Sequence, residues 1–219
     1  MGAAIPLLVE ALSAPALSAD EAWWAIYAQA FPAREREPRQ VIIRSLERGV
    51  GMAFRARRGA TTVGLASAHL LKSVPAVFLV YVATAPEARG TGAGRALVDR
   101  TWQRGAAALQ AQHLDAGGLI WEIEDPDGAV GDLLRAERQA RLRFFQGLGG
   151  QLLARPYMQP PVDGVAPVPM RLMYRPAPGT PIPADASIDD LVRAIYFEKY
   201  GELNGIPSQV LSNLLDNAP

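Results

Sequence analysis

A dense run of glycines follows an apolar segment near the middle of the chain. Residues 76–85 are mostly apolar, and they lead into Arg89-Gly90-Thr91-Gly92-Ala93-Gly94 before a helical pattern begins at Arg95. Glycine permits the positive φ angles of a tight turn and lets a ligand approach the backbone closely. The free N–H groups at the start of a helix form the positive end of its dipole. The sequence therefore predicts a strand, an anion-binding turn and a helix, in that order.

The spacing of the glycines excludes two common phosphate loops. A dinucleotide fingerprint G-x-G-x-x-G would need glycine at position 95 or 97, where the chain has Arg95 and Leu97. A nucleotide-triphosphatase loop would need Gly-Lys followed by Ser or Thr, and the sequence contains no such segment. A turn of this kind without any ligand is the remaining alternative to an anion site.

The spacing that fits is Arg/Gln-x-x-Gly-x-Gly/Ala, formed by Arg89, Gly92 and Gly94. Together with the strand before it, segment 82–97 resembles the coenzyme A pyrophosphate loop of the GNAT superfamily of N-acetyltransferases. The resemblance implies acetyl-CoA as co-substrate, no metal, and main-chain contacts from the strand to the pantetheine arm. The residues that it assigns to the coenzyme are Val82, Thr84, Arg89, Gly90, Thr91, Gly92, Ala93, Gly94, Arg95 and Phe145.

Composition narrows the other classes of function. The 22 basic and 22 acidic residues cancel, so we expect no broad basic surface and no nucleic-acid partner. The absence of cysteine excludes disulfides, thiolate metal sites and a cysteine nucleophile. No apolar run reaches the roughly 18 residues of a membrane span. The apolar segment 1–19 lacks a basic start and contains Glu10, so we interpret it as part of a cytoplasmic protein rather than as a signal peptide.

Hydrophobic periodicity predicts alternating helices and strands. We expect Asp20 to cap a first helix that ends at Pro32. The other expected helices cover about 38–47, 94–112, 132–147, 187–200 and 208–215, and the expected strands cover 52–57, 61–70, 76–84, 118–124, 151–154 and 168–175.

This order of elements is similar to that of the GNAT fold over about residues 17–175. The resemblance implies an α/β mixed sheet that is mostly antiparallel, with helices on both faces and one parallel pair of strands after the glycine turn. We therefore divide the chain into a GNAT acetyltransferase domain at 1–175, a Pro-rich linker at 176–186 and a C-terminal helical extension at 187–219.

Acyl transfer in this family proceeds by direct attack of an amine on the thioester, and the amine must first lose a proton. Trp121-Glu122-Ile123 matches a Leu-Glu-Val segment whose glutamate acts as base, so Glu122 is the first candidate for this role and Glu124 the second. Glu124 lies two residues on and shares the sheet face, and the second charge would raise the pKa of one carboxyl. The alternative is that one or both are solvated at the strand end.

The chain departs from the family in its fourth predicted helix, 132–147. Phe145 stands where the family often has the tyrosine that protonates the leaving thiolate, and Arg138 stands where an asparagine is usual. Phe145 can pack against pantetheine but cannot donate a proton. Tyr157, Tyr174 or water would then serve instead.

Glu35 and Glu37 lie in the link between the first two helices, which rims the acceptor site in the resembled family. A carboxylate there could recruit a cationic amine, although alternation with arginine is also typical of a solvated charge cluster. His69 at a strand end is a second acceptor-side candidate, with a structural role as the alternative. We assign Glu35, Glu37, His69 and Tyr157 to acceptor binding.

The sequence thus indicates an N-acetyltransferase that moves the acetyl group of acetyl-CoA directly to an amine of a small molecule. A non-catalytic acyl-CoA-binding module and a peptide or protein amine acetyltransferase are the alternatives. Leu191, Ile195 and Leu203 repeat at four and eight residues in the extension, so we expect an apolar stripe that covers either its own sheet or a partner subunit. We favour a homodimer in which the extension contributes to the interface or to the acceptor rim.

Overall fold

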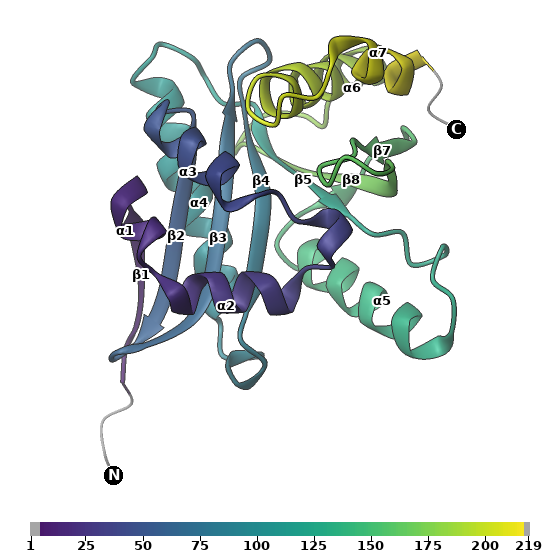
Figure 1. Cartoon of the computed structure of the whole chain (residues 1–219). Helices are drawn as coiled ribbons and strands as arrows, with labels where there is room; N and C mark the ends of the chain where they lie inside the picture. Colours follow the sequence, from purple (N-terminus) through teal and green to yellow (C-terminus); the bar gives the residue numbers. More distant parts are fainter. Residues whose placement is uncertain (1–4, 217–219) are drawn as a thin grey trace.

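The computed structural model shows a mixed sheet of eight strands with helices on both faces (Figure 1). It describes residues 5–216, so residues 1–4 and the last three residues of the extension lie outside the described part. The strands are β1 (Leu7–Leu12), β2 (Gly51–Arg58), β3 (Thr61–Leu71), β4 (Ala76–Thr84), β5 (Gly118–Ile123), β6 (Gln151–Leu152), β7 (Tyr157–Gln159) and β8 (Val168–Pro176). The helices are α1 (Ala14–Ser18), α2 (Glu21–Ala30), α3 (Arg39–Glu47), α4 (Ala93–Gln110), α5 (Asp132–Gln146), α6 (Asp185–Ala194) and α7 (Ser208–Asp216), with short 3₁₀ helices η1 (Ala33–Glu35) and η2 (Pro86–Ala88) and a π-helix η3 (Ile195–Gly201).

The strands follow the order β1-β2-β3-β4-β5-β8-β6, and β7 pairs with β8 beside this path. Every pair is antiparallel except β4 and β5, which α4 connects. This is the mixed, mostly antiparallel sheet that the sequence predicts, and the fold class is confirmed. None of the helices between residues 5 and 216 combines the length and the apolar character that a membrane crossing requires.

Helices α4 and α5 cover one face of the sheet. Leu97 and Val98 of α4 and Phe145 of α5 are buried there against Trp121 of β5. Burial of each such side chain stabilises the fold by about 1.5–3 kcal/mol. This face is therefore closed by the helix that begins at the glycine turn, which fixes that turn at one edge of the core.

The opposite face carries α1 to α3 over the first half of the sheet and the C-terminal helices over the second half (Figure 1). Trp23, Trp24 and Tyr27 of α2 pack against Leu65 and Tyr81 of the sheet. The N–H of Trp23 donates to Asp20 at 3.0 Å, which confirms the predicted helix cap. On this face, α1 to α3 therefore lie on one side of the end of β5, and the C-terminal helices lie on the other side.

The predicted apolar stripe of the extension is buried on the sheet of its own chain. Leu191 and Ile195 belong to the same buried cluster as Phe78 of β4 and Ile120 of β5. Ile195 and Tyr196 are 0% and 1% exposed, so the stripe is fully covered without a second subunit. The sequence left open whether the stripe covers its own sheet or a partner subunit, and in the structure it covers its own sheet.

Two strands and one short helix were not expected from the sequence, and one helix differs in type. β1 and α1 lie in the apolar N-terminal segment, where β1 pairs with β2, and β7 lies inside the Pro-rich connection of residues 156–167 and pairs with β8. β1 pairs with a strand more than 40 residues away, and β7 has only three residues, so local periodicity gives little sign of either strand. The predicted helix over 187–200 begins at Asp185 and becomes a π-helix at Ile195.

Candidate active site

The glycine turn leads from β4 into α4 and leaves open space beside its backbone. Gly90 and Gly92 have φ angles of +73° and +87°, which residues with side chains rarely adopt. A Cβ at either position would meet no atom of the described residues within 4 Å. Gly92 is also the N-cap of α4, and within residues 5–216 no side chain bonds to the helix start. The first-turn N–H groups of Ala93 and Gly94 therefore remain available for a pyrophosphate.

Side chains around the glycine turn hold it in place and add positive charge. The Arg58 guanidinium donates to the Thr91 carbonyl at 3.2 Å, and the Thr91 hydroxyl donates to the carbonyl of Ala88, just before the turn, at 2.7 Å. Arg95 donates to the carbonyl of Gly147 at 3.0 Å, which ties the turn to the end of α5. Arg89 is exposed. The turn fits an anionic ligand both in shape and in charge.

β4 and β5 pair over three residues and then separate. Residues 77–79 face residues 119–121, and the pairing ends there. The register between β3 and β4 shifts at this level, so that Val80 is an extra residue in β4. Beyond it, Val82 and Thr84 pair with β3 alone, within the part of the chain that the structure describes. The backbone of this stretch of β4 faces a fork into which an extended ligand arm could insert, so their predicted main-chain contacts have a place in the fold.

Glu122 is the first residue of β5 beyond the fork, and three side chains bind its carboxylate. The Tyr157 hydroxyl donates to Oε1 at 2.5 Å, and the Gln159 amide donates to Oε2 at 2.8 Å. The Tyr200 hydroxyl lies 2.8 Å from Oε1 and 2.9 Å from Oε2. Two of these donors come from β7 and one from η3. The carboxylate is thereby fixed at the point where the two strands part.

Burial raises the pKa of the Glu122 carboxyl from 4.5 to about 7. The hydrogen bonds from Tyr157, Tyr200 and Gln159 favour the charged form and oppose this rise, while the negative charge of Glu37 adds to it. A carboxyl with a pKa near neutrality is suited to accept a proton at physiological pH. The sequence suggested that the charge of Glu124 would raise the pKa, whereas burial is the main cause in the structure.

Glu124 lies on the α5 side of the fork and is paired with two arginines. Its Oε1 lies 3.2 Å from Arg138, and its Oε2 accepts a hydrogen bond from Arg141. Arg138 thus occupies the family's asparagine position and acts as an ion-pair partner. Glu35 is buried nearby, and its pKa is raised by burial and by the charge of Glu124. These contacts show that Glu124 is not solvated at the strand end.

Glu37 is buried beside the base candidate rather than exposed on the rim. Its Oε1 accepts a hydrogen bond from Lys199 at 2.5 Å, and both side chains are 3% exposed or less. The Tyr81 hydroxyl accepts from the Glu37 N–H at 3.0 Å, and the Tyr27 hydroxyl donates to the Glu37 carbonyl at 3.1 Å. Burial of Glu35 and Glu37 excludes the solvated charge cluster that the sequence left open.

The remaining residues that the sequence assigns to the site lie on both faces of the sheet. His69 is buried, and burial together with the charges of Lys199 and Lys72 lowers its pKa to about 3, so it is neutral at pH 7. Phe145 packs against Trp121 with ring centroids 4.8 Å apart. Tyr174 faces Ile120 in the sheet and its ring lies over Gly118, four residues before Glu122. Of the two tyrosines considered as proton donors, the structure places only Tyr157 at the Glu122 carboxylate.

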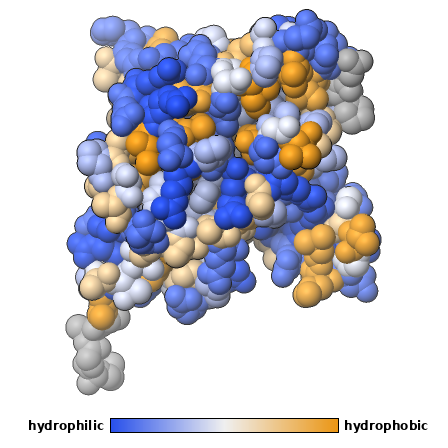
Figure 2. Space-filling model, viewed as in Figure 1, coloured by the Kyte–Doolittle hydropathy of each residue, from blue (hydrophilic) through white to orange (hydrophobic). Residues whose placement is uncertain are grey.

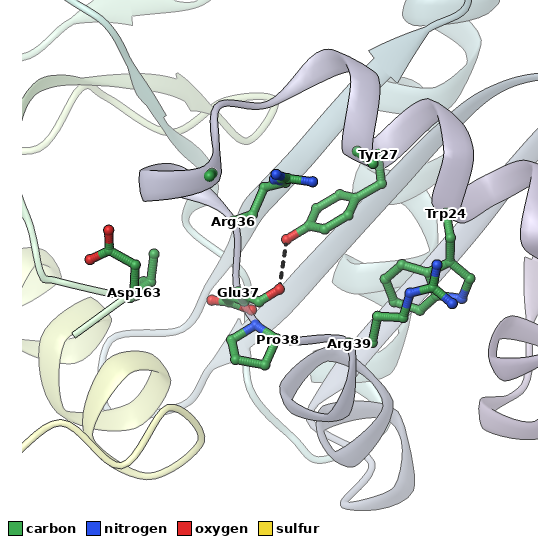
Figure 3. Close-up of a pocket in the computed structure, with 10 residues that line it drawn as sticks. Trp24, Tyr27, Arg36, Glu37, Pro38, Arg39 and Asp163 are labelled. Carbon is green, nitrogen blue, oxygen red and sulfur yellow. Dashed lines mark hydrogen bonds between the residues drawn. The ribbon is translucent and has the colours of Figure 1, made fainter. Parts of the chain in front are cut away.

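A cavity of about 380 Å³ opens between α2, the link that follows it, and the loop after β7 (Figure 3). Tyr27, Glu37 and Arg36 line one side, and Asp163 lies across from them. The Nε atom of Arg36 is buried without a hydrogen-bond partner among the described residues. Arg39 lies over the Trp24 ring at 4.9 Å. The cavity therefore presents both signs of charge beside aromatic rings, which suits a small polar ligand.

Three residues of this site are not among those predicted from the sequence. Gln159 lies in the unpredicted strand β7, and Lys199 and Tyr200 lie in the extension, which falls outside the resembled fold. Lys199 is one of two lysines in the chain and lies within the apolar stripe, between Ile195 and Leu203 at the same four-residue spacing. A charged residue at such a position is a usable sign of a buried pair. No group of three or more His, Asp or Glu side chains suited to a metal ion occurs between residues 5 and 216.

Comparison with known proteins agrees with this geometry. The model of the acetyltransferase (GNAT) family matches residues 20–116, which include the glycine turn. No curated protein matches the sequence.

Among solved structures, a GNAT-family protein from Bacteroides thetaiotaomicron has a TM-score of 0.64 at 17% identity, over 91% of this chain and 99% of its own. The ribosomal-protein-S18-alanine N-acetyltransferase from Escherichia coli has a TM-score of 0.50 at 16% identity, over 82% and 98%. NAA60 from Arabidopsis thaliana in complex with acetyl-CoA has a TM-score of 0.56 at 9% identity, over 80% and 100%. At these identities the structural likeness shows the fold.

Proposed function

Because the model of the GNAT acetyltransferase family matches residues 20–116 and a solved GNAT-family structure shares the fold, we propose that the chain transfers the acetyl group of acetyl-CoA directly to an amine of a small molecule, with Glu122 as the base. One observation carries the proposal. Glu122 is a half-buried carboxyl with a pKa of about 7, and it stands where β4 and β5 separate. Enzymes place perturbed carboxyls in this way for proton transfer.

Acetyl-CoA supplies the acetyl group as a thioester when it is bound. The glycine turn with Gly90 and Gly92 would hold the pyrophosphate, and the backbone of β4 beyond Val80 would hold the pantetheine arm. Phe145 stands on the α5 side against Trp121, where it offers an apolar wall to the arm. A structural neighbour in complex with acetyl-CoA supports this assignment.

The base acts on the acceptor amine, which is mostly protonated at pH 7. Glu122 takes the proton from the ammonium nitrogen, because near its pKa a large fraction of the carboxyl is ionised. Tyr157 and Tyr200 donate to the carboxylate oxygens and keep the carboxylate plane fixed. The amine lone pair then attacks the thioester carbonyl carbon, the carbon–sulfur bond breaks, and the thiolate leaves. The nitrogen loses its second proton as the amide forms, and that proton reaches the thiolate through water or through the Tyr157 hydroxyl.

The cavity beside Glu37 supports a small acceptor. Its volume of about 380 Å³ suits a compact molecule, and the exposed Asp163 on its lining would attract a cationic amine, whereas the Glu37 carboxylate is already paired with Lys199. Arg36 and Arg39 would hold an anionic or polar group of the same molecule. The alternative is the amine of a peptide or protein, since one structural neighbour is the ribosomal-protein-S18-alanine N-acetyltransferase from Escherichia coli.

We also propose a cytoplasmic homodimer, as expected from the sequence. Since the extension covers its own sheet, the interface would use another surface. Val130 and Leu133 at the start of α5 are 92% and 78% exposed, and Figure 2 shows hydrophobic side chains gathered over this end of α5 at the lower right. Light scattering of the parent and of Leu133→Glu measures the mass. A parent with the mass of one chain would contradict the dimer.

The function is tested by mass spectrometry of ligands that co-purify with the protein, followed by an amine screen. Acetyl-CoA is mixed with a panel of small amines and of peptides, and released thiol is measured for the parent and Glu122→Gln. We expect thiol release with a small amine and its loss in the variant. Acetylation of peptides alone would favour the protein-amine alternative. Binding of acetyl-CoA without thiol release with any amine would favour the non-catalytic binding module.

A further inference from the structure

The C-terminal extension reaches the base through a π-helix. η3 covers Ile195–Gly201, and the N–H of Glu202 donates to the carbonyl of Phe197 at 3.0 Å, five residues back. Such wide turns are rare and occur most often at functional sites. Here the turn directs Lys199 and Tyr200, neighbours in sequence, into the interior, where both are 3% exposed or less. Lys199 meets Glu37, and Tyr200 meets both oxygens of Glu122.

The π-helix is anchored on both sides of Tyr200. Glu198 accepts hydrogen bonds from the N–H groups of Lys72 and Ser73 at 2.7 and 2.9 Å, which fastens it to the turn between β3 and β4. Lys199 also donates to Asn204 at 3.0 Å, in addition to its contact with Glu37. These contacts leave Tyr200 little freedom. Its hydroxyl is held at the Glu122 carboxylate before any substrate arrives.

We propose that Tyr200 is a positioning residue for the Glu122 carboxylate, and that the C-terminal extension thereby completes the catalytic site of this chain. The inference rests on the proposed role of Glu122 as base. The Tyr200 hydroxyl lies within 2.9 Å of both carboxylate oxygens, so it fixes the plane of the carboxylate as well as its place. Preorganised second-layer donors of this kind keep a reacting group within the narrow geometry that catalysis needs.

The effect of a substitution at Tyr200 on the pKa of Glu122 depends on the other groups that face this carboxyl. β7 contributes Tyr157 and Gln159, and η3 contributes Tyr200, with the Tyr196 ring beside them. Further away, the link before α3 contributes the charge of Glu37, and that charge is paired with Lys199 of η3. His69 of β3 lies near Lys199 and is neutral, so it adds no charge at pH 7.

Tyr200 donates to the charged form of Glu122, so its loss should raise the pKa of that carboxyl. The test compares Tyr200→Phe with Tyr196→Phe in the full-length protein. Tyr196 is the matched control because it lies in the same π-helix and is equally buried, but its hydroxyl donates to the Met158 carbonyl at 2.6 Å instead. Carbon-13 NMR of glutamate side-chain carboxyls, assigned with Glu122→Gln, follows the titration of Glu122 without any ligand.

We expect the Glu122 titration to move to higher pH in Tyr200→Phe and to stay at the parent value in Tyr196→Phe. An unchanged titration in Tyr200→Phe, or equal shifts in both variants, would overturn the proposal. Thermal unfolding checks that each variant folds, and Tyr200→Met serves as a second variant should Tyr200→Phe lose its structure. The titration needs no acceptor, so it reports on Tyr200 even if the protein acetylates no amine.

Kinetics with an accepted amine give the second readout. We expect kcat/KM of Tyr200→Phe to fall by about five-fold at pH 7, because a smaller fraction of the base is ionised, and to approach the parent near pH 9. KM for acetyl-CoA should not change. A loss of equal size at every pH, shared by Tyr196→Phe, would mean that Tyr200 has only a structural role.

Discussion

The Nζ atom of Lys199 lies 2.5 Å from Oε1 of Glu37, and both side chains are buried. The two residues are 162 positions apart in the sequence. Their ion pair joins the link before α3 to the C-terminal extension, beside the cavity that we assign to the acceptor. A buried pair of this kind costs a good deal to desolvate, so its effect on stability depends on both partners being present.

Lys199→Met should destabilise the protein by about 3–5 kcal/mol, because it leaves the Glu37 carboxylate buried without a partner. The double variant Glu37→Gln/Lys199→Met should recover most of that loss, since it removes both charges. Urea unfolding of the parent, the two single variants and the double variant measures these differences. A double variant no more stable than Lys199→Met would contradict this account of the pair.

Gly92→Val should abolish the binding of acetyl-CoA, because a branched side chain would fill the open space that the pyrophosphate must enter. The positive φ angle adds a strain of about 1–2 kcal/mol. Gly131→Val is the matched control, since Gly131 is the N-cap of α5 with a φ angle of +91° and similarly open space.

Calorimetry of acetyl-CoA binding and thermal unfolding separate the two effects of this change. We expect both valine variants to lose stability, with at least as large a loss in Gly131→Val because the ψ angle of Gly131 is 152°, and only Gly92→Val to lose binding. Binding by Gly92→Val within a factor of two of the parent would show that the turn does not hold the coenzyme.

Glu122→Gln keeps the shape of the side chain and removes its basicity, so turnover should fall by about 10²–10⁴-fold with little change in acetyl-CoA affinity. Glu124→Gln should have a smaller effect, because Glu124 is paired with Arg138 and Arg141. Steady-state kinetics with an accepted amine measure both. Unchanged turnover in both variants would leave solvent or neutral His69 as the base.

The pH dependence of kcat/KM should show an acidic limb with an apparent pKa of about 7. Glu122 must be ionised to accept a proton, so activity is present above this pH and falls ten-fold per unit below it. The limb should vanish from the residual activity of Glu122→Gln. A parent profile that stays flat down to pH 5 would remove Glu122 from the role of base.

The free energy of unfolding should also depend on the ionisation of Glu122, and it should fall with rising pH whereas activity rises. The pKa of Glu122 is raised from 4.5 to about 7 in the folded protein, so the folded state binds an extra proton between these values. The stabilising contribution is complete below pH 4.5 and is lost as the pH rises through about 7. Relative to Glu122→Gln, the free energy of unfolding of the parent should fall by about 1.4 kcal/mol per pH unit across this window. Parallel stability curves would contradict it.

Much of the fold is predictable from the sequence, because long elements carry strong local patterns. β4 has the predicted limits of Ala76 and Thr84, and α4 follows the glycine turn as expected. β1 is not predictable because its partner strand lies more than 40 residues along the chain, and β7 is not predictable because it has only three residues within a Pro-rich connection. β7 matters for the site, since it carries both Tyr157 and Gln159.

Glu122 could be predicted because Trp121-Glu122-Ile123 resembles the family's Leu-Glu-Val segment, but the groups around its carboxylate could not. The donors on its carboxylate come from residues 157, 159 and 200, which no periodic pattern connects with residue 122. The assignment of Glu35 and Glu37 to the acceptor side stays a prediction. Alternation with arginine suggested solvation, and only the tertiary structure shows that both carboxylates are buried.

The wide turn of η3 makes the site sensitive to the backbone conformation of this segment as well as to its composition. An α-helix advances about 100° per residue, and a π-helical turn accommodates one residue more than an α-helical turn. If the segment kept its length and formed a regular α-helix instead, Tyr200 would turn by about a quarter of a revolution relative to α6. Every chemical group of the site would still be encoded, yet the hydroxyl would no longer point at Glu122. In this segment the loss of the wide turn is therefore equivalent to losing a side chain.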